Sequence, residues 1–153
     1  MAFYRFLKEE NKEFKKCLGQ IAEDWDNLSI IAKTVFSDTK QYKNNISESR
    51  IKEEINKLSS DSSLPKIING QEKYWGLLSE GLIDKLHRIV GLETKNGVFS
   101  KQDFYDQIVA VTKGAYYYYL RDRFVPENKE EEVAQFFFIR EYCFGSMFRF
   151  NSE

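Results

Sequence analysis

The segment Ala134–Glu153 reads AQFFFIREYCFGSMFRFNSE and is rich in aromatic residues. Its four successive apolar residues, 136–139, cannot all lie on one face of a helix, so this part is either deeply buried or docked against another surface. From Phe144 to Phe150 every second residue shares one face of a strand, and three of those four residues are phenylalanine. Asn151 then favours a turn. We therefore predict a helix that runs into the first strand of a hairpin, whose second strand lies beyond the sequence.

Apolar residues upstream of this segment recur at helical spacing. The first helix is predicted from Asn11 to Phe36, because apolar side chains return every three or four residues along one face. A second stripe runs from Tyr74 to Gly91, and a glycine at this position favours a helix end. A third helix is predicted to begin at Ser100, because Ser100 and Asp103 resemble a capping box in which Asp replaces Glu or Gln. Helices therefore account for most of the chain before the aromatic segment.

Between these helices the composition turns polar over residues 37–63, with the stretches SDTKQYKNN and SSDSS. This segment is predicted to be a loop-rich insertion that holds one short helix through Ile51, Ile55 and Leu58. The expected fold is mostly α: a single domain over residues 1–153, with about five helices ending in a strand or an incomplete β-hairpin. A length of 153 residues is enough to bury a core of its own.

Composition and charge exclude several classes of protein. Aromatic residues make up 16% of the chain, which argues against a disordered tail, and the formal charge of −1 gives no global attraction to nucleic acid or membrane. Cys17 and Cys143 are isolated and lack the spacing of a metal site, so reduced thiols in a cytoplasmic protein are expected. The charged start of the chain is unlike a secretory signal, and no apolar run approaches the roughly 20 residues that span a membrane.

The isolated polar residues in the helices are expected to have structural or surface positions, not catalytic roles. Asp24 and Asp26 flank Trp25, but residues two apart on a helix point away from one another, so both carboxylates are expected in solvent. His87 has basic neighbours and no second histidine, which favours a surface position over a catalytic base. The four tyrosines 116–119 must point all around their helix, so some pack in the core and others lie at its edge, where contact with DNA sugar or phosphate is the alternative.

Two blocks of this sequence resemble a known enzyme family. The run FFFIREYCFGSMFRFN, residues 136–151, resembles the helix-to-hairpin junction of the Dam-type adenine-specific DNA methyltransferases, which has the pattern Asn-Arg-x-x-(Phe/Tyr)-Asn-Gly-Leu-x-Arg-x-Asn. The run GAYYYYLRDRF, residues 114–124, is similar to the family's Tyr-Tyr-x-x-Arg-x-x-Phe block. The resemblance covers roughly residues 70–153. It implies the target-recognition part of a restriction-modification type of enzyme, whose methyl donor is S-adenosylmethionine.

The resemblance also implies roles for residues of the aromatic segment. Phe144 would stack where the target base is extruded, Met147 would make an apolar base contact, and Arg149 would read guanine in the major groove. Arg140 would anchor the helix end or a phosphate. The implied DNA-binding set is completed by Gly145, Ser146 and Asn151. Gly145-Ser146-Met147 stands where the family has Asn-Gly-Leu, so a different target sequence is expected; the structural alternative for Phe144 is the core of the hairpin.

The motifs that would bind the cofactor and catalyse methyl transfer are missing from this sequence. It contains neither a Gly-x-Gly turn nor the Asp-Pro-Pro-Tyr loop that holds the flipped adenine in the resembled family. We therefore expect a fragment, a truncated gene product or half of a split enzyme, which binds no S-adenosylmethionine alone and has double-stranded DNA and the missing catalytic portion as partners. Its six cations from Lys113 to Arg149 are cancelled by six anions, so composition adds no support for DNA binding.

A second hypothesis belongs to a different class of function. The chain is then a small all-helical interaction protein without catalysis, which docks into a partner through its aromatic C-terminal segment. Both hypotheses require residues 136–139 to be buried against something, so an exposed apolar patch is expected in the isolated chain.

Overall fold

The computed structural model describes residues 2–67 and 71–143, and these residues form six α-helices, one short 3-10 helix and no strand. The helices are α1 (Ala2–Lys8), α2 (Lys12–Thr39), η1 (Lys40–Lys43), α3 (Glu48–Ser59), α4 (Gln71–Asn96), α5 (Lys101–Asp122) and α6 (Lys129–Cys143). The prediction of a mostly α fold is confirmed. The predicted strand falls on residues that lie outside the described ranges.

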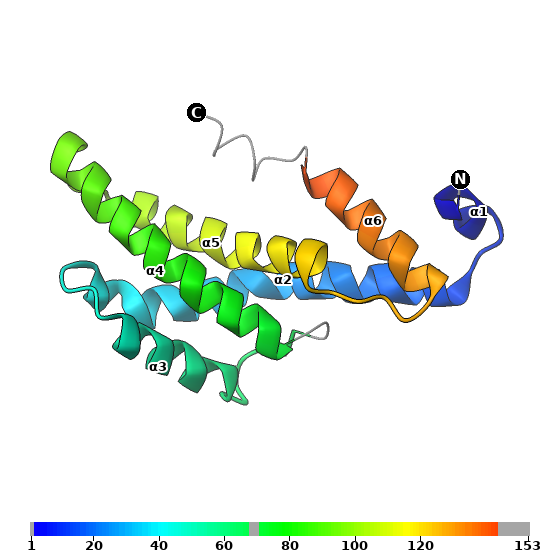
Figure 1. Ribbon diagram of the computed structural model, residues 1–153, viewed down its shortest axis with the longest axis horizontal. Helices are drawn as coiled ribbons and strands as arrows, with labels where there is room; N and C mark the ends of the chain where they lie inside the picture. Colours follow the sequence, from blue (N-terminus) through cyan, green and yellow to red (C-terminus); the bar gives the residue numbers. More distant parts are fainter. Residues whose placement is uncertain (1, 68–70, 144–153) are drawn as a thin grey trace.

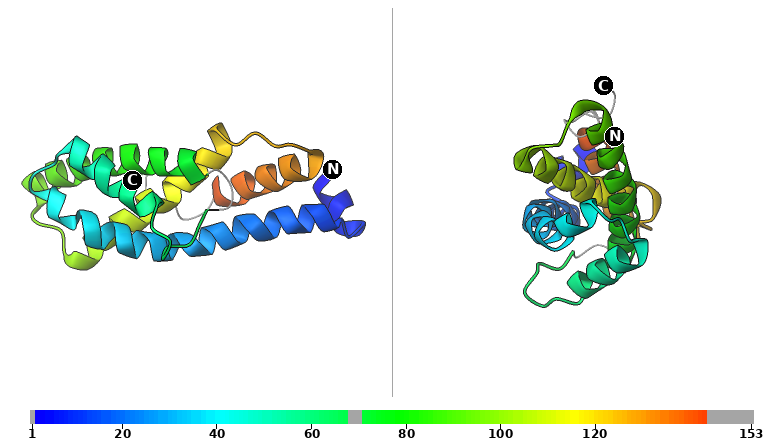
Figure 2. Two further views of the ribbon diagram at one scale, coloured as in Figure 1. Left: turned by 90° about the horizontal axis from the view of Figure 1, so that it is seen from below. Right: turned by 90° about the vertical axis from the view of Figure 1, so that its left-hand side faces the viewer.

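The 28-residue helix α2 runs along the length of the molecule and contacts most of the other helices (Figure 1). Asn11 begins this helix, because its side-chain oxygen accepts a hydrogen bond from the Phe14 backbone N–H at 2.9 Å. Helix α5 packs along α2, whereas α6 and the short α1 lie near the N-terminal end of α2 (Figure 1; Figure 2, left). The predicted first helix is therefore correct, and it extends three residues beyond Phe36.

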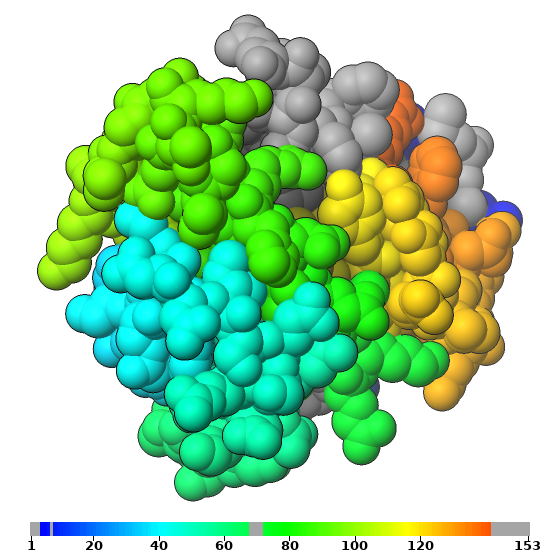
Figure 3. Space-filling view, turned by 60° about the vertical axis from the view of Figure 1, so that its left-hand side comes forward, coloured from blue at the N-terminus to red at the C-terminus, as the bar shows by residue number. Residues whose placement is uncertain are grey.

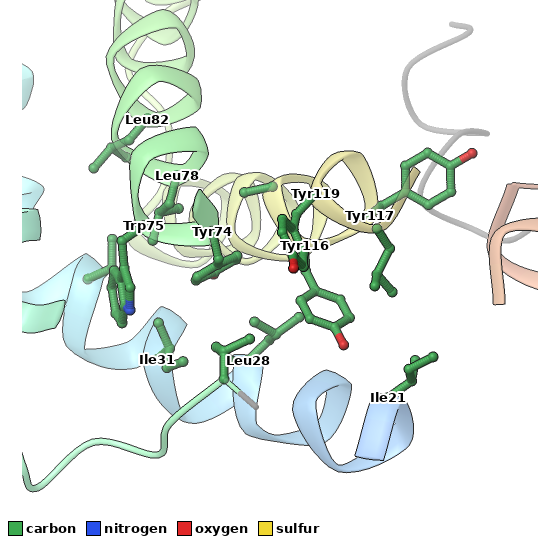
Figure 4. Packing of buried hydrophobic residues seen from close by; sticks show 14 of the residues in the cluster. Ile21, Leu28, Ile31, Tyr74, Trp75, Leu78, Leu82, Tyr116, Tyr117 and Tyr119 are labelled. Atoms are coloured by element: carbon green, nitrogen blue, oxygen red, sulfur yellow. The ribbon is translucent and has the colours of Figure 1, made fainter. Parts of the chain in front are cut away.

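The core lies where α2, α4 and α5 meet, and its centre is aromatic (Figure 4). Leu28 of α2 and Leu78 of α4 are fully buried beside Tyr74 and Tyr116, whose rings meet edge to face with centroids 6.2 Å apart. The Tyr74 hydroxyl donates a hydrogen bond to the carbonyl of Thr112 on α5 at 3.1 Å. Burial raises the pKa of Tyr74, so this hydroxyl stays protonated and remains a donor.

The polar segment around residues 37–63 contains more helix than the sequence suggested. Helix α3 has the predicted buried residues Ile51, Ile55 and Leu58, and it packs against α4 and α2. Figure 3 shows the face of the molecule on which α4 lies between α3 and α5. The short helix predicted here is therefore present as α3, and it contributes to the core.

Helix α4 and the start of α5 show one error and one success of the sequence prediction. Helix α4 does not end at Gly91 but continues to Asn96, and the following Gly97 has the positive φ of 91° that a helix end often requires. Ser100 caps α5 as predicted, since its side chain accepts a hydrogen bond from the Asp103 backbone N–H. Helices α4 and α5 cross closely at Gly81, where an added Cβ would lie 3.1 Å from Val111 Cγ2.

Candidate nucleic-acid interface

Helix α6 carries the first half of the aromatic segment and is anchored by Phe138. This side chain is 3% exposed, and its ring packs edge to face against Trp25 of α2 and Tyr116 of α5, with centroids 5.4 and 5.8 Å away. The Gln135 side chain also donates a hydrogen bond to the backbone carbonyl of Leu120 on α5. Gln135 and Phe138 therefore hold α6 against α2 and α5.

The opposite face of α6 is open to solvent. Phe136 is 61% exposed, and it lies between the exposed residues Glu132 and Arg140, each four positions away along the helix. The predicted apolar patch at residues 136–139 is thus divided between the two faces. Phe138 is in the core, whereas Phe136 remains uncovered in the isolated chain.

The acidic start of α6 serves to begin the helix. The Asn128 side chain accepts a hydrogen bond from the Glu131 backbone N–H at 2.9 Å, and the Glu131 carboxylate accepts one from the Glu127 backbone N–H at 2.7 Å. Glu130 accepts a hydrogen bond from the Asn11 side chain, which joins the start of α6 to the start of α2. These acids fix the position of α6 and stabilise its positive N-terminal end.

Three of the four successive tyrosines of α5, Tyr116, Tyr117 and Tyr119, are buried, and Tyr118 is 40% exposed. This division agrees with the sequence prediction. The guanidinium of Arg121 lies over the rings of Tyr118 and Tyr117, 4.8 and 5.7 Å from their centres. It also donates two hydrogen bonds of 2.8 Å to Asp122, which lower the pKa of that carboxyl group. The charge of Arg121 is therefore already balanced within the protein.

The structure contradicts the prediction that the Asp24 side chain lies in solvent. It is fully buried and accepts a hydrogen bond of 2.7 Å from the Tyr116 hydroxyl, and its negative charge, together with burial as the larger cause, raises the pKa of Tyr119. The reason is helical register: positions 17, 21, 24, 28 and 31 follow steps of four and three residues along the buried face of α2. This spacing was visible in the sequence and could have identified Asp24. Asp26 is exposed, as predicted.

Two clefts lie on either side of α4. One, of about 950 Å³, separates α3 from α4 and includes the buried Trp75, whose indole N–H has no hydrogen-bond partner among the described residues. The other, of about 580 Å³, lies between α4 and α5 and has both basic and acidic side chains on its walls. In the second cleft, Lys85 donates a hydrogen bond to Gln107 at 3.3 Å, and its pKa is lowered by burial and by Arg88.

The second cleft gives no clear preference for an anion or a cation. Its three basic side chains, Lys85, Arg88 and Arg123, face three acidic ones on the same walls, Glu80, Asp84 and Asp122. His87 is exposed on α4 nearby and does not line either cleft, in agreement with its predicted surface position.

Of the predicted DNA-binding residues, Arg140 alone falls in the part of the chain that the structure describes. It is exposed near the end of α6. The remaining predicted residues lie outside the described ranges: Phe144, Gly145, Ser146, Met147, Arg149 and Asn151. The described residues thus define the helix that leads to the predicted reading segment, but not the segment itself.

The described residues do not fit a site for S-adenosylmethionine. The resembled enzymes hold it at a glycine-rich turn, whereas the glycines described here are helical apart from Gly97, which follows α4. The described part of the chain also has no group of three or more His, Cys, Asp or Glu residues that could hold a metal ion. Burial, with Glu13 as a smaller cause, raises the pKa of the free thiol of Cys17 to about 11, so this cysteine is not an activated nucleophile.

None of the helices in the described ranges is both long and apolar enough to cross a membrane. No protein-family model matches this sequence, and comparisons with curated proteins and with solved structures found no significant match.

Proposed function

We propose that this chain is the DNA-recognition part of a site-specific adenine DNA methyltransferase, which transfers a methyl group from S-adenosylmethionine to the adenine amino group. The observation that carries the proposal is the run of residues 136–151, which resembles the recognition junction of that family. The anchoring of α6 supports it. Base readout needs side chains on a rigid support, and Phe138 packs this helix against Trp25 and Tyr116 five residues before its end.

In this proposal the residues that follow α6 read the DNA. Phe144 stacks at the site of the extruded base, Met147 makes an apolar base contact, and Arg149 donates two hydrogen bonds to guanine O6 and N7. Arg140 contacts a phosphate, which sets the register of the protein on the duplex. Gly145, Ser146 and Asn151 complete the contact segment.

The rest of the proposed enzyme supplies the chemistry. S-adenosylmethionine provides the methyl group when it is bound, and a catalytic portion with the glycine-rich turn and the Asp-Pro-Pro-Tyr loop would hold both this cofactor and the flipped adenine. The present chain binds and orients the duplex, and it is inactive by itself. The proposal places the protein in the cytoplasm, with double-stranded DNA and the catalytic portion as its partners.

The proposal is tested by selecting duplexes from a randomised pool with the purified chain and measuring their affinities by fluorescence anisotropy. We expect enrichment of a short adenine-containing site. Arg149→Ala should lose the preference for guanine at one position, at a cost of about 1–3 kcal/mol on the selected site. Arg140→Ala should weaken selected and random duplexes alike, since a phosphate contact carries no sequence information.

Lys33→Ala is a suitable control for these variants, because Lys33 is an exposed cation on α2, distant in sequence from the aromatic segment. Its binding should equal that of the unmodified chain. A chain that is folded by circular dichroism, yet enriches no sequence and binds no duplex at low salt, would rule the proposal out.

The exposed ring of Phe136 favours a second candidate function, a helical interaction protein that docks through α6. An uncovered phenylalanine on an otherwise anchored helix is the kind of anchor that protein interfaces use. In this case Phe136→Ser would abolish self-association or dye binding, measured by sedimentation and by fluorescence of a hydrophobic dye. Duplex binding that survives Phe136→Ser but not Arg149→Ala would decide for the DNA-recognition proposal.

A further inference from the structure

Lys113 is held at the junction of α2, α5 and α6 by an aromatic ring. Its ammonium group lies 5.2 Å from the centre of the Trp25 ring, and its side chain is half-buried on α5. The same tryptophan packs against Phe138 of α6 and Tyr116 of α5. The position of Lys113 is therefore tied to the anchor of α6.

Lys113 forms no ion pair with an acid in the described part of the chain. No described carboxylate lies within 4.0 Å of its ammonium group. The ion pairs among the described residues involve other cations: Lys43–Glu93, Lys57–Glu54, Arg121–Asp122 and Lys129–Glu132. The acid next to Trp25 in α2, Asp24, is fully buried and accepts a hydrogen bond from Tyr116. A ring attracts the cation through its π face and does not accept hydrogen bonds as a carboxylate does. The N–H groups of Lys113 therefore remain able to bind an anion.

Other cations that lie over rings differ from Lys113 in charge balance or in place. Lys43 and Arg121 are already paired with acids. Lys40 lies over Phe36 at the far end of α2, and Arg5 lies over Phe6 on α1, away from Trp25. Lys113 contacts the ring against which Phe138 packs. Phe138 lies five residues before Cys143, so this junction is about 8 Å along the helix axis from the end of α6.

We propose that Lys113 binds a backbone phosphate of the duplex that the proposed function assigns to this chain. This inference rests on the proposed function and adds a contact on α5 that the resemblance did not assign. The ring of Trp25 holds the ammonium group in place before DNA binds, so less side-chain freedom is lost on forming the contact. As a phosphate contact, Lys113 adds affinity and register but no base preference.

The experiment is a salt titration of duplex binding by fluorescence anisotropy, with a labelled duplex of random sequence and with the selected duplex. Lys113→Gln should weaken both duplexes several-fold and reduce the slope of log K against log salt by about 1, the loss of one phosphate contact. Lys113→Arg should retain the slope, because the charge and the contact with Trp25 are kept. Lys40→Gln is the matched control, which removes another cation from above a ring and should leave affinity and slope unchanged.

These measurements distinguish a failure of the Lys113 contact from a failure of the proposed function. If Lys113→Gln keeps the affinity and slope of the unmodified chain while Arg149→Ala loses its base preference, the inference is wrong and the proposed function stands. Equal losses in Lys113→Gln and Lys40→Gln would also overturn it, since only the net charge would then matter. A folded, unmodified chain that binds neither duplex overturns the proposed function and the Lys113 contact together.

Discussion

At the scale of single residues, Tyr116 joins the four largest helices around one buried charge. Its ring contacts Trp25, Tyr74 and Phe138, which lie on α2, α4 and α6, and its hydroxyl donates to the carboxylate of Asp24. Burying a carboxylate is costly unless hydrogen bonds replace water. The hydroxyl of Tyr116 therefore stabilises the fold as well as its ring does.

Tyr116→Phe keeps the ring and removes this donor. We expect the free energy of unfolding to fall by about 1–3 kcal/mol, the usual cost of leaving a buried acceptor short of one hydrogen bond. Urea denaturation followed by circular dichroism measures the change. Tyr118→Phe is the matched control on the same helix, and its more exposed side chain should cost less than about 0.5 kcal/mol. Equal midpoints for the two variants would contradict the role of Tyr116.

The ion pair between Glu93 and Lys43 is expected to make a pH-dependent contribution to stability. Its carboxylate accepts hydrogen bonds of 2.6 Å from the Lys43 ammonium and from the Phe99 backbone N–H, and the bond from Lys43 is the main cause of its lowered pKa. A carboxyl group whose pKa is lower in the folded state adds stability above its unfolded pKa. This stability is lost as the pH falls through the folded pKa.

Glu93→Gln should accordingly be less stable than the unmodified chain at neutral pH, and the difference should shrink as acid protonates Glu93 in the unmodified chain. Urea midpoints measured from neutral to acidic pH test this expectation. Glu53→Gln is the control, because Glu53 is exposed on α3 and has no ion pair among the described residues. A difference between Glu93→Gln and the unmodified chain that stays constant over this pH range would contradict the prediction.

At the scale of the element, α4 shows how tertiary contacts override a local signal. Gly91 suggested a helix end, but Leu86 and Ile89 are buried just before it and Glu93 is paired with Lys43 just after it. These contacts outweigh the roughly 1 kcal/mol that a glycine costs inside a helix. The helix ends instead before Gly97, whose φ of 91° suits glycine.

Replacing Gly91 or Gly97 with alanine should change the free energy of unfolding in opposite directions. Gly91→Ala should raise the free energy of unfolding by about 0.5–1 kcal/mol, since an added Cβ meets no atom within 4 Å and the unfolded chain loses freedom. Gly97→Ala should lower it by about 1 kcal/mol, because alanine is strained at a positive φ. Thermal and urea denaturation of both variants measure these changes. A stabilising Gly97→Ala would show that α4 ends differently.

At the scale of the whole molecule, α6 is attached to the three-helix core by one face and leaves the other open. Phe138→Ala should lower the free energy of unfolding by about 3–5 kcal/mol, because it empties the space between Trp25 and Tyr116. Phe136→Ala should change stability by less than about 0.5 kcal/mol and reduce the binding of a hydrophobic dye. Hydrogen exchange of the α6 amides provides a local measurement. Equal costs for the two substitutions would mean that α6 packs differently.

Much of the helical architecture was predictable because it depends on local spacing and on capping chemistry. The stripe from Phe14 to Ile31, the cap at Ser100 and the short helix through Ile55 follow from patterns within a few turns of helix. The two errors have different causes. The burial of Asp24 follows from its position on the buried face of α2, a spacing that the sequence already contains, whereas the continuation of α4 past Gly91 is supported by Lys43, a residue far away in the sequence.

The sequence by itself determined that the protein is mostly helical and that helices begin after Asn11 and Ser100, because these features depend on local spacing and capping. Only the tertiary structure decided which side of α6 is buried, since 136–139 are all apolar and either face could have been chosen. Packing decided it, because Phe138 meets two rings from α2 and α5 while Phe136 meets solvent. The same packing placed Lys113 over Trp25, the ring against which Phe138 of α6 packs, a proximity that no spacing along the chain contains.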